Sequence, residues 1–168
     1  QARFIILTNS NLHYLWDLER GNPTIINRFP TQITLEGFSE FKPKKDLILQ
    51  EVVNDDYLVL TQNPNYSKDP DFINPKTRKD FTDKNKLVFL RPYQLNAIKS
   101  IQESIKNGND RFLFEMATGT GKTSTSAGVI KLFLRTENSK RILFLVDRIE
   151  LEEQAQKSFN HILKSDYT

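Results

Sequence analysis

The sequence predicts an α/β fold over residues 87–168, with a parallel sheet whose strands are joined by crossover helices. Two apolar runs, residues 111–115 and 142–146, are typical of buried strands. Helical periodicity precedes the first run, lies between the two runs and follows the second. A glycine-rich segment, ATGTGKT, connects the first run to the helix behind it. The order strand, loop, helix, strand, helix is that of a parallel sheet with helical crossovers.

Three helices are expected in this region because apolar residues recur there at intervals of three and four. The first helix ends near Gly108, which suits a C-terminal cap, and the second runs from about residue 123 to residue 134. Their apolar faces are formed by Leu95, Ile98, Ile101 and Ile105 in the first helix, by Val129, Ile130 and Phe133 in the second, and by Leu151, Ala155, Phe159 and Ile162 in the third.

The first 86 residues have a different character. Apolar and aromatic runs separated by turn residues predict strands at residues 4–7, 13–18, 24–26 and 57–60, with two short helices before the last of them. Residues 61–86 are rich in proline, asparagine and charge, which favour turns over regular structure. We therefore expect a β-rich domain end over residues 1–60, a linker or long surface loop over residues 61–86, and the α/β domain over residues 87–168.

Composition excludes several classes of protein. The chain has no cysteine, which excludes disulfides and thiolate metal sites, and only two histidines, too few for a histidine-based zinc site. No apolar run approaches the ~20 residues of a membrane span, so no membrane partner is expected. The net charge of +3 arises from residues 86–168, which fits a polyanionic partner and equally fits solvated surface lysines.

The segment from Ala117 to Thr123 is typical of a loop that holds the phosphates of a nucleoside triphosphate. It follows the pattern G-x-x-x-x-G-K-[ST], except that Ala117 replaces the first glycine. Gly119 and Gly121 allow the backbone to curl around an anion at the positive end of the next helix. Lys122 is expected to reach the β- and γ-phosphates, and the Thr123 hydroxyl to bind Mg²⁺. The predicted phosphate-binding residues are Thr118, Gly119, Thr120, Gly121, Lys122 and Thr123.

Two further stretches resemble motifs of superfamily 2 helicases and translocases, whose ATPase core is a RecA-like P-loop domain. LRPYQLNAI, residues 90–98, resembles the start of that core, which implies that Gln94 reads the adenine edge while Arg91 and Tyr93 help to hold the base. ILFLVDRIELEEQ resembles the next motif, which implies that Arg148 contacts the DNA backbone. Each residue also has an ordinary structural interpretation: Gln94 and Arg148 as solvated helix residues, and Tyr93 as core packing.

The amino-terminal stretch FIILTNSNLHYLWDLERGNP, with FPT after it, resembles the end of the nuclease domain in the restriction (R) subunit of type I restriction enzymes. FLVDRIELEEQA is also similar to that subunit. The resemblance covers residues 3–30 and 87–160. It implies ATP and Mg²⁺ as cofactors, double-stranded DNA together with modification and specificity subunits as partners, and a cytoplasmic location in a prokaryotic cell.

Parts of that machinery have no candidate in the sequence. Residues 1–60 contain no D…E-x-K arrangement for a nuclease, and no strand ends in the Asp-Glu pair of a Walker B motif. We therefore expect a fragment of a DNA-translocating endonuclease that has no complete catalytic site and hydrolyses ATP slowly. The alternatives are another superfamily 2 helicase or the restriction subunit of a type III system, a small P-loop kinase, and a non-catalytic DNA-binding module.

Overall fold

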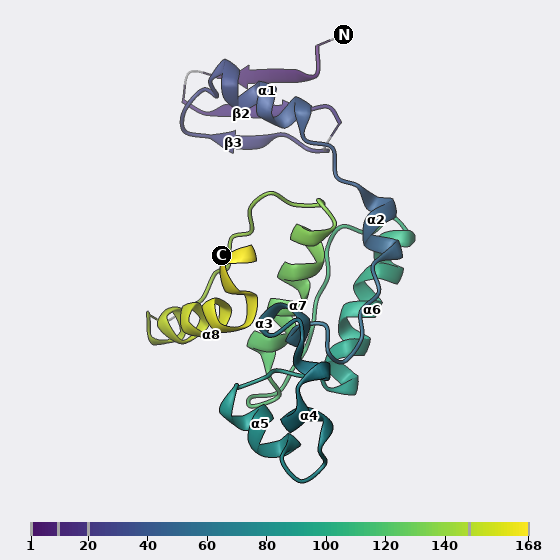
Figure 1. The fold of residues 1–168 in the computed structure, drawn as a ribbon. Helices are drawn as coiled ribbons and strands as arrows, with labels where there is room; N and C mark the ends of the chain where they lie inside the picture. Colours follow the sequence, from purple (N-terminus) through teal and green to yellow (C-terminus); the bar gives the residue numbers. More distant parts are fainter. Residues whose placement is uncertain (1, 10, 20, 148, 168) are drawn as a thin grey trace. The chain divides into compact units, whose positions relative to one another are not determined.

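The chain folds into two compact units, Gln1–Lys42 and Pro43–Thr168, shown in Figure 1. The structure is a computed structural model, and it describes residues 2–9, 11–19, 21–147 and 149–167. Among these residues, no helix is both long enough and apolar enough to cross a lipid bilayer. Each unit is described separately below.

The first unit is a three-stranded antiparallel sheet followed by one helix. β1 (Phe4–Thr8) pairs with β2 (His13–Asp17), and β2 pairs with β3 (Thr24–Ile26). α1 (Gln32–Glu40) follows the sheet. The side chain of Thr31 caps this helix by accepting a hydrogen bond from the backbone N–H of Thr34. The three strands predicted before residue 30 are confirmed.

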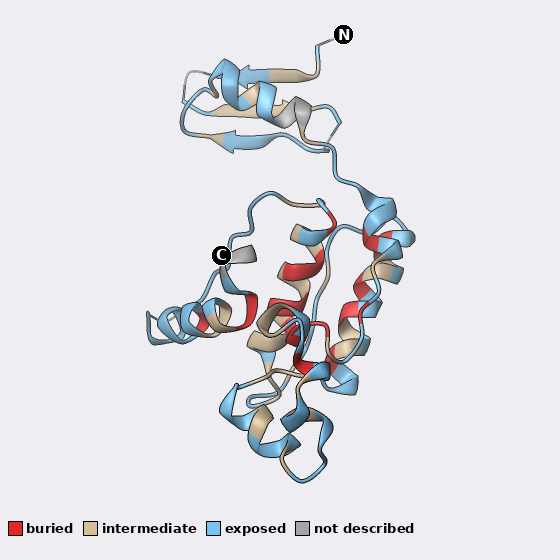
Figure 2. Ribbon diagram, in the orientation of Figure 1, coloured by how far each residue is buried: buried red, intermediate tan, exposed pale blue. Residues whose placement is uncertain are grey.

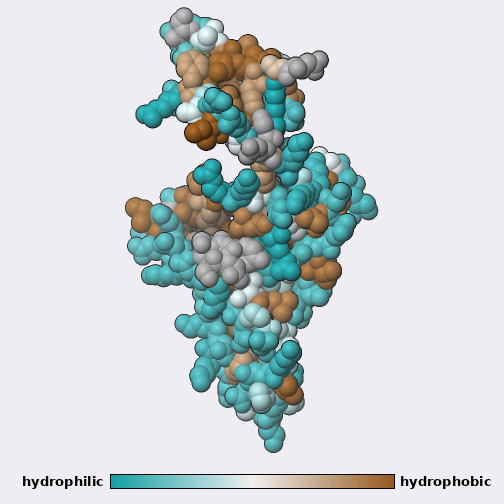
Figure 3. All heavy atoms as spheres, turned by 45° about the horizontal axis from the view of Figure 1, so that its top comes forward, coloured by the Kyte–Doolittle hydropathy of each residue, from teal (hydrophilic) through white to brown (hydrophobic). Residues whose placement is uncertain are grey.

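This first unit leaves much of its apolar surface exposed. Ile25 and Ile33 expose 60% and 80% of their surface, and hydrophobic side chains gather over this unit in Figure 3. Polar contacts reinforce the strand pairing, because the Arg3 guanidinium forms two parallel 2.9 Å bonds with the Asp17 carboxylate. The assignment of this unit to a nuclease-type domain stays a prediction.

The second unit is helical and contains the main hydrophobic core. Buried residues, red in Figure 2, come from short helices near its start and from three longer helices, and they include Ile48, Leu58, Ile98, Leu132 and Leu163. The helices are α2 (Lys45–Gln50), α3 (Val59–Gln62), η1 (Tyr66–Lys68), α4 (Pro70–Ile73), α5 (Arg78–Lys84), α6 (Pro92–Lys106), α7 (Lys122–Arg135) and α8 (Ile149–Tyr167). The three helices predicted from periodicity correspond to α6, α7 and α8.

The strand predicted at residues 57–60 was wrong, because the chain forms a turn and then α3 there. The backbone N–H of Leu60 donates to the carbonyl of Asp56, and that of Gln62 donates to the carbonyl of Leu58. The run of aromatic and β-branched residues indicated a strand, but Leu58 and Val59 reach complete burial in a helical turn. Tertiary packing here overrides local strand propensity.

Residues 61–86 form an ordered layer of short helices instead of a loose linker. Asp69 caps α4 by accepting from the N–H of Asp71, and Pro70 occupies the first helical position, where its missing N–H costs nothing. Tyr66 and Phe72 pack edge to face with ring centroids 4.7 Å apart. Asp69 and Pro70, two of the residues that predicted a loop, begin a helix here.

The structural boundary accordingly differs from the predicted one. The two units meet at residues 42 and 43, whereas the sequence suggested changes at residues 60 and 86. Ile48 and Leu58 belong to the same buried cluster as Ile98 and Leu132, which places the segment before α6 in the second unit. The change in composition at residue 61 therefore marks a change in local structure and not the boundary of the hydrophobic core.

The two apolar runs predicted as parallel strands are extended but not paired. The backbone of residues 111–117 and 141–146 is neither helical nor part of a sheet ladder. Their side chains alternate in the way a strand requires: Leu143 and Leu145 expose 81% and 79%, whereas Phe144 between them exposes 40% and contacts Phe159. The parallel sheet and the RecA-like fold therefore stay predictions.

Leu132 and Leu143 offer a direct test of this burial pattern. Leu132→Ala should lower the free energy of unfolding by about 2–5 kcal/mol, because it leaves a cavity in a completely buried position. Leu143→Ala should change it by less than about 0.5 kcal/mol, because most of that side chain already contacts water. Urea unfolding followed by circular dichroism measures both, and equal losses would contradict the assigned core.

A second test concerns Tyr66, whose hydroxyl donates to the carboxylate of Asp56 at 2.9 Å. Burial, that hydrogen bond and the charges of Asp56 and Asp55 raise the pKa of Tyr66 from 10.0 to about 12. Between these values the unfolded chain loses the phenolic proton while the folded chain keeps it, so stability falls as pH rises from 10 to 12. At pH 9 Tyr66→Phe should be about 1 kcal/mol less stable, because it lacks the hydrogen bond.

The stability difference between wild type and Tyr66→Phe should narrow at pH 11, because phenylalanine has no proton to release. Urea midpoints of both proteins at pH 9 and pH 11 measure it. A difference that stays constant over this range would show that the Tyr66 hydroxyl titrates equally in both states.

Candidate functional site

The loop between residue 116 and α7 has the curled backbone that its sequence predicted. Gly119 and Gly121 both adopt left-handed conformations, with φ of 79° and 80°. Gly121 is the N-cap of α7, and its carbonyl accepts the N–H of Thr125 at 3.0 Å to begin the helix. The first N–H groups of a helix have no intrahelical acceptor, and the helix dipole places positive charge beside them. This geometry suits an anion.

The Lys122 side chain turns back over the loop. Its Nζ donates to the carbonyls of Met116 and Ala117, both at 3.3 Å. Lys122 and the neighbouring Thr118 and Gly119 are exposed, so the loop is accessible from solvent. Two long bonds to neutral carbonyls are weaker than bonds to a charged acceptor, and the ammonium can exchange them for phosphate oxygens.

Two side chains from the start of α6 contact this loop, and a third contacts one of them. The Nε2 of Gln94 donates to the carbonyls of Thr120 and Gly121, at 3.1 and 3.2 Å. The hydroxyl of Tyr93 donates to the same Thr120 carbonyl at 2.7 Å, and Arg91 donates to the Tyr93 hydroxyl at 3.1 Å. The structure therefore brings together the residues that the helicase resemblance singled out, although Tyr93 and Gln94 contact the loop backbone and Arg91 contacts Tyr93.

Gln94 is buried, with 3% of its surface exposed, and both ends of its amide are engaged. Its Oε1 accepts the backbone N–H of Arg91 at 2.8 Å, which satisfies the N-cap N–H at the start of α6. Recognition of adenine by this amide requires these bonds to rearrange, and it stays a prediction. The interpretation of Gln94 as a solvated helix residue was wrong.

The structure describes Thr123 but not Arg148. Thr123 is half-buried in the first turn of α7. Arg148 lies outside the described residues, and its predicted contact with DNA stays a prediction. Across the described ranges of the chain, no three His, Cys, Asp or Glu side chains are grouped so that they could hold a metal ion. A cation at this site would rely on Thr123 and on the oxygens of its nucleotide.

Sequence reasoning missed one charged residue in this region. Lys131 lies on α7 with only 2% of its surface exposed, although lysine on a helix normally indicates a solvated face. Its Nζ donates to the carbonyl of Tyr57. On the same helix a Cβ on Gly128 would lie 2.4 Å from Cδ1 of Ile98, so α6 and α7 approach closely there. The neighbouring small residues Ala127 and Gly128 were the available signal for that buried face.

The two loop glycines form a matched pair for mutation. Both Gly119→Ala and Gly121→Ala place a side chain on a left-handed residue, at a cost of about 1–2 kcal/mol. A Cβ on Gly121 would also lie 2.4 Å from Nε2 of Gln94, whereas a Cβ on Gly119 meets nothing within 4 Å. Gly121→Ala should therefore lower the free energy of unfolding by about 1–3 kcal/mol more than Gly119→Ala, because the buried amide loses its acceptors.

Urea unfolding of both variants under identical conditions measures this difference. Equal losses would mean that Gln94 does not hold the loop.

The region that contains this site matches a known protein family. Residues 87–168 match the family model described as "Type III restriction enzyme, res subunit". The match begins just before α6 and includes the loop and α7. No solved structure matches the chain.

Curated relatives come from type I restriction systems. The EcoKI endonuclease subunit of Escherichia coli K12 is 44% identical over 70 residues, which are 42% of this chain and 6% of that protein. The EcoAI endonuclease subunit of Escherichia coli is 42% identical over 84 residues, or 50% of this chain and 10% of that protein. The SauCOLORF180P endonuclease subunit of Staphylococcus aureus strain COL is 35% identical over 79 residues, which are 46% of this chain and 8% of that protein.

The matched region is thus a tenth or less of the length of these relatives. These sequence identities confirm the resemblance to type I restriction enzymes. The chain is a homologue of the endonuclease subunits of type I restriction enzymes, with a ResIII-family domain over residues 87–168.

Proposed function

We propose that this chain is the ATP-binding part of the DNA-translocating endonuclease (R) subunit of a type I restriction–modification system. The observation that carries the proposal is the curled loop before α7, with its two left-handed glycines and the Lys122 ammonium above them. The names of the curated relatives supply the system, since they are endonuclease subunits of type I restriction enzymes. ATP is the ligand and double-stranded DNA the macromolecular substrate in this proposal.

Each residue of the loop has a distinct role in holding the nucleotide. The N–H groups at the start of α7 and residues 118–121 bind phosphate oxygens. Lys122 exchanges its bonds to Met116 and Ala117 for bonds to the β- and γ-phosphates. Arg91 and Tyr93, both exposed beside the loop, contact the base together with Gln94.

Mg²⁺ accompanies the nucleotide in this proposal. The ion prefers oxygen ligands and keeps several of its waters, so it needs few groups from the protein. The Thr123 hydroxyl, in the first turn of α7, fits that requirement. When bound, the ion neutralises charge on the phosphates.

The wider assembly follows from the same family assignment. We propose that modification and specificity subunits are partners, and that Arg148 contributes to DNA contact. A type III restriction subunit is the second candidate, because the matching family model carries that description. The curated relatives favour the type I assignment.

Lys122→Ala tests the nucleotide site. It should weaken binding of Mg-ATP by about 10- to 100-fold, since a charged hydrogen bond contributes about 1.5–3 kcal/mol. Lys157→Ala is the matched control. Lys157 is exposed on α8, far along the chain from the loop, and its replacement removes the same charge. Calorimetric titration of both variants measures the affinities, and equal affinities for Lys122→Ala and wild type would refute the proposed site.

A further inference from the structure

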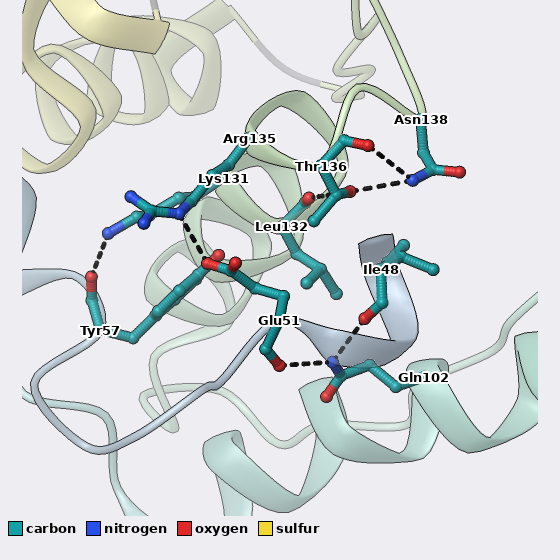
Figure 4. A network of polar contacts seen from close by, with 9 residues as sticks. All are labelled: Ile48, Glu51, Tyr57, Gln102, Lys131, Leu132, Arg135, Thr136 and Asn138. Atoms are coloured by element: carbon teal, nitrogen blue, oxygen red, sulfur yellow. Dashed lines mark hydrogen bonds and ion pairs between the residues drawn. The ribbon is translucent and has the colours of Figure 1, made fainter. Parts of the chain in front are cut away.

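Lys131 is a buried cation that nucleotide binding itself does not explain. Its Nζ donates a hydrogen bond to the backbone carbonyl of Tyr57 and lies 4.1 Å from the centroid of the Tyr57 ring. Figure 4 shows this contact between α7 and the turn before α3. Burying an ammonium group is costly unless its donors are satisfied, and an apolar side chain of similar length would pack without that cost. The cost of burying this ammonium group therefore points to a specific geometric role for Lys131.

The segment that receives Lys131 is fixed to both helices of the site. Arg135 of α7 forms a 2.7 Å ion pair with Glu51. Gln102 of α6 donates to the carbonyls of Ile48 and Glu51, at 2.6 and 2.9 Å. These contacts, also drawn in Figure 4, tie residues 48–57 to the helix that carries Gln94 and to the helix that begins at Lys122.

The turn at residues 55–58, here called the Tyr57 turn, is connected by hydrogen bonds to the phosphate loop. The carbonyl of Asp55 accepts the N–H of Leu90 at 2.7 Å. The next residue, Arg91, donates its N–H to Oε1 of Gln94. Gln94 in turn holds the carbonyls of Thr120 and Gly121, where α7 begins. Nine residues further along α7, Lys131 returns to the Tyr57 turn, so the contacts form a closed ring.

We propose that Lys131 is a positioning residue for the phosphate loop. Within the ring, α7 is held at two points: at its first residues by Gln94, and at Lys131 by the carbonyl of Tyr57. Loss of the second point leaves apolar packing and the half-exposed Arg135–Glu51 ion pair to hold α7, which allows α7 to shift against the segment that carries Leu90 and Arg91 and misaligns Gln94 with Thr120 and Gly121. Because the loop and the start of α7 bind the phosphates, the effect on affinity rests on the proposed function.

Lys131→Met removes the donor and keeps a side chain of similar length and volume. Hydrogen exchange of the intact 168-residue chain is the primary measurement, because it reports separately the two backbone donors of the ring, Leu90 and Arg91, and the first helical bond of α7, donated by Thr125. The amides of Leu90, Arg91 and Thr125 should exchange at least tenfold faster than in wild type. Amides within α8 should keep their rates. Lys131→Leu, which also lacks a donor, serves as the second variant if the methionine protein does not fold, with the same expected direction.

Leu163→Ala is the matched control for general destabilisation, since Leu163 is buried at 1% exposure on α8 and takes no part in the ring. It should accelerate amides only through global unfolding, without preference for Leu90 or Arg91. The proposal is overturned if Lys131→Met leaves the three amides at their wild-type rates, or accelerates them no more than Leu163→Ala does.

Nucleotide affinity is the second measurement, at a temperature where all variants are fully folded. Lys131→Met should bind Mg-ATP about tenfold more weakly than wild type, whereas Leu163→Ala should bind as wild type does. Unchanged affinity of Lys131→Met in a wild type that binds nucleotide overturns the positioning role. Absence of nucleotide binding by wild type would refute the proposed function, and hydrogen exchange would still decide whether Lys131 holds the loop.

Discussion

The contact between Gln94 and the backbone of the loop before α7 is the constraint on which the second unit's candidate site depends. One buried amide joins three features: the cap of α6, the left-handed residue Gly121 and the first residues of α7. Gly121 has no room for a Cβ because Nε2 of Gln94 already occupies that space. The curled loop and the start of two helices are thus a single packed element, and a change in one of them alters the others.

Polar contacts in the second unit also fix the orientation of its helices. The apolar cluster around Ile98 and Leu132 supplies non-directional packing, which by itself fixes neither the rotation nor the axial position of a helix. Bonds to backbone carbonyls are directional and set both. Gln102 and Lys131 provide such bonds to residues 48–57, which explains how a segment without long secondary structure is held against α6 and α7.

The structural unit is larger than the part of the chain that matches a known family. The family model begins at residue 87, whereas the compact unit begins at Pro43. Residues 43–86 cover one end of α6 and α7 and contribute Ile48 and Leu58 to the core. The ResIII-family region therefore does not bury its helices alone.

Local sequence determined the elements whose signals are local. Two glycines followed by lysine and threonine specified the curled loop, since only glycine adopts its left-handed angles cheaply. Periodic apolar residues specified α6 and α7, and turn residues specified the three strands of the first unit.

Tertiary structure alone decided which face of each element is buried and what polar groups meet there. Periodicity placed Val129, Ile130 and Phe133 inward on α7, but tertiary packing buries Leu132, and Lys131 against Tyr57, more completely. Residues 57–60 became helical because the core accepts their side chains in that form. The engagement of Gln94 depends on a loop 26 residues away in sequence, and no local pattern encodes a contact at that separation.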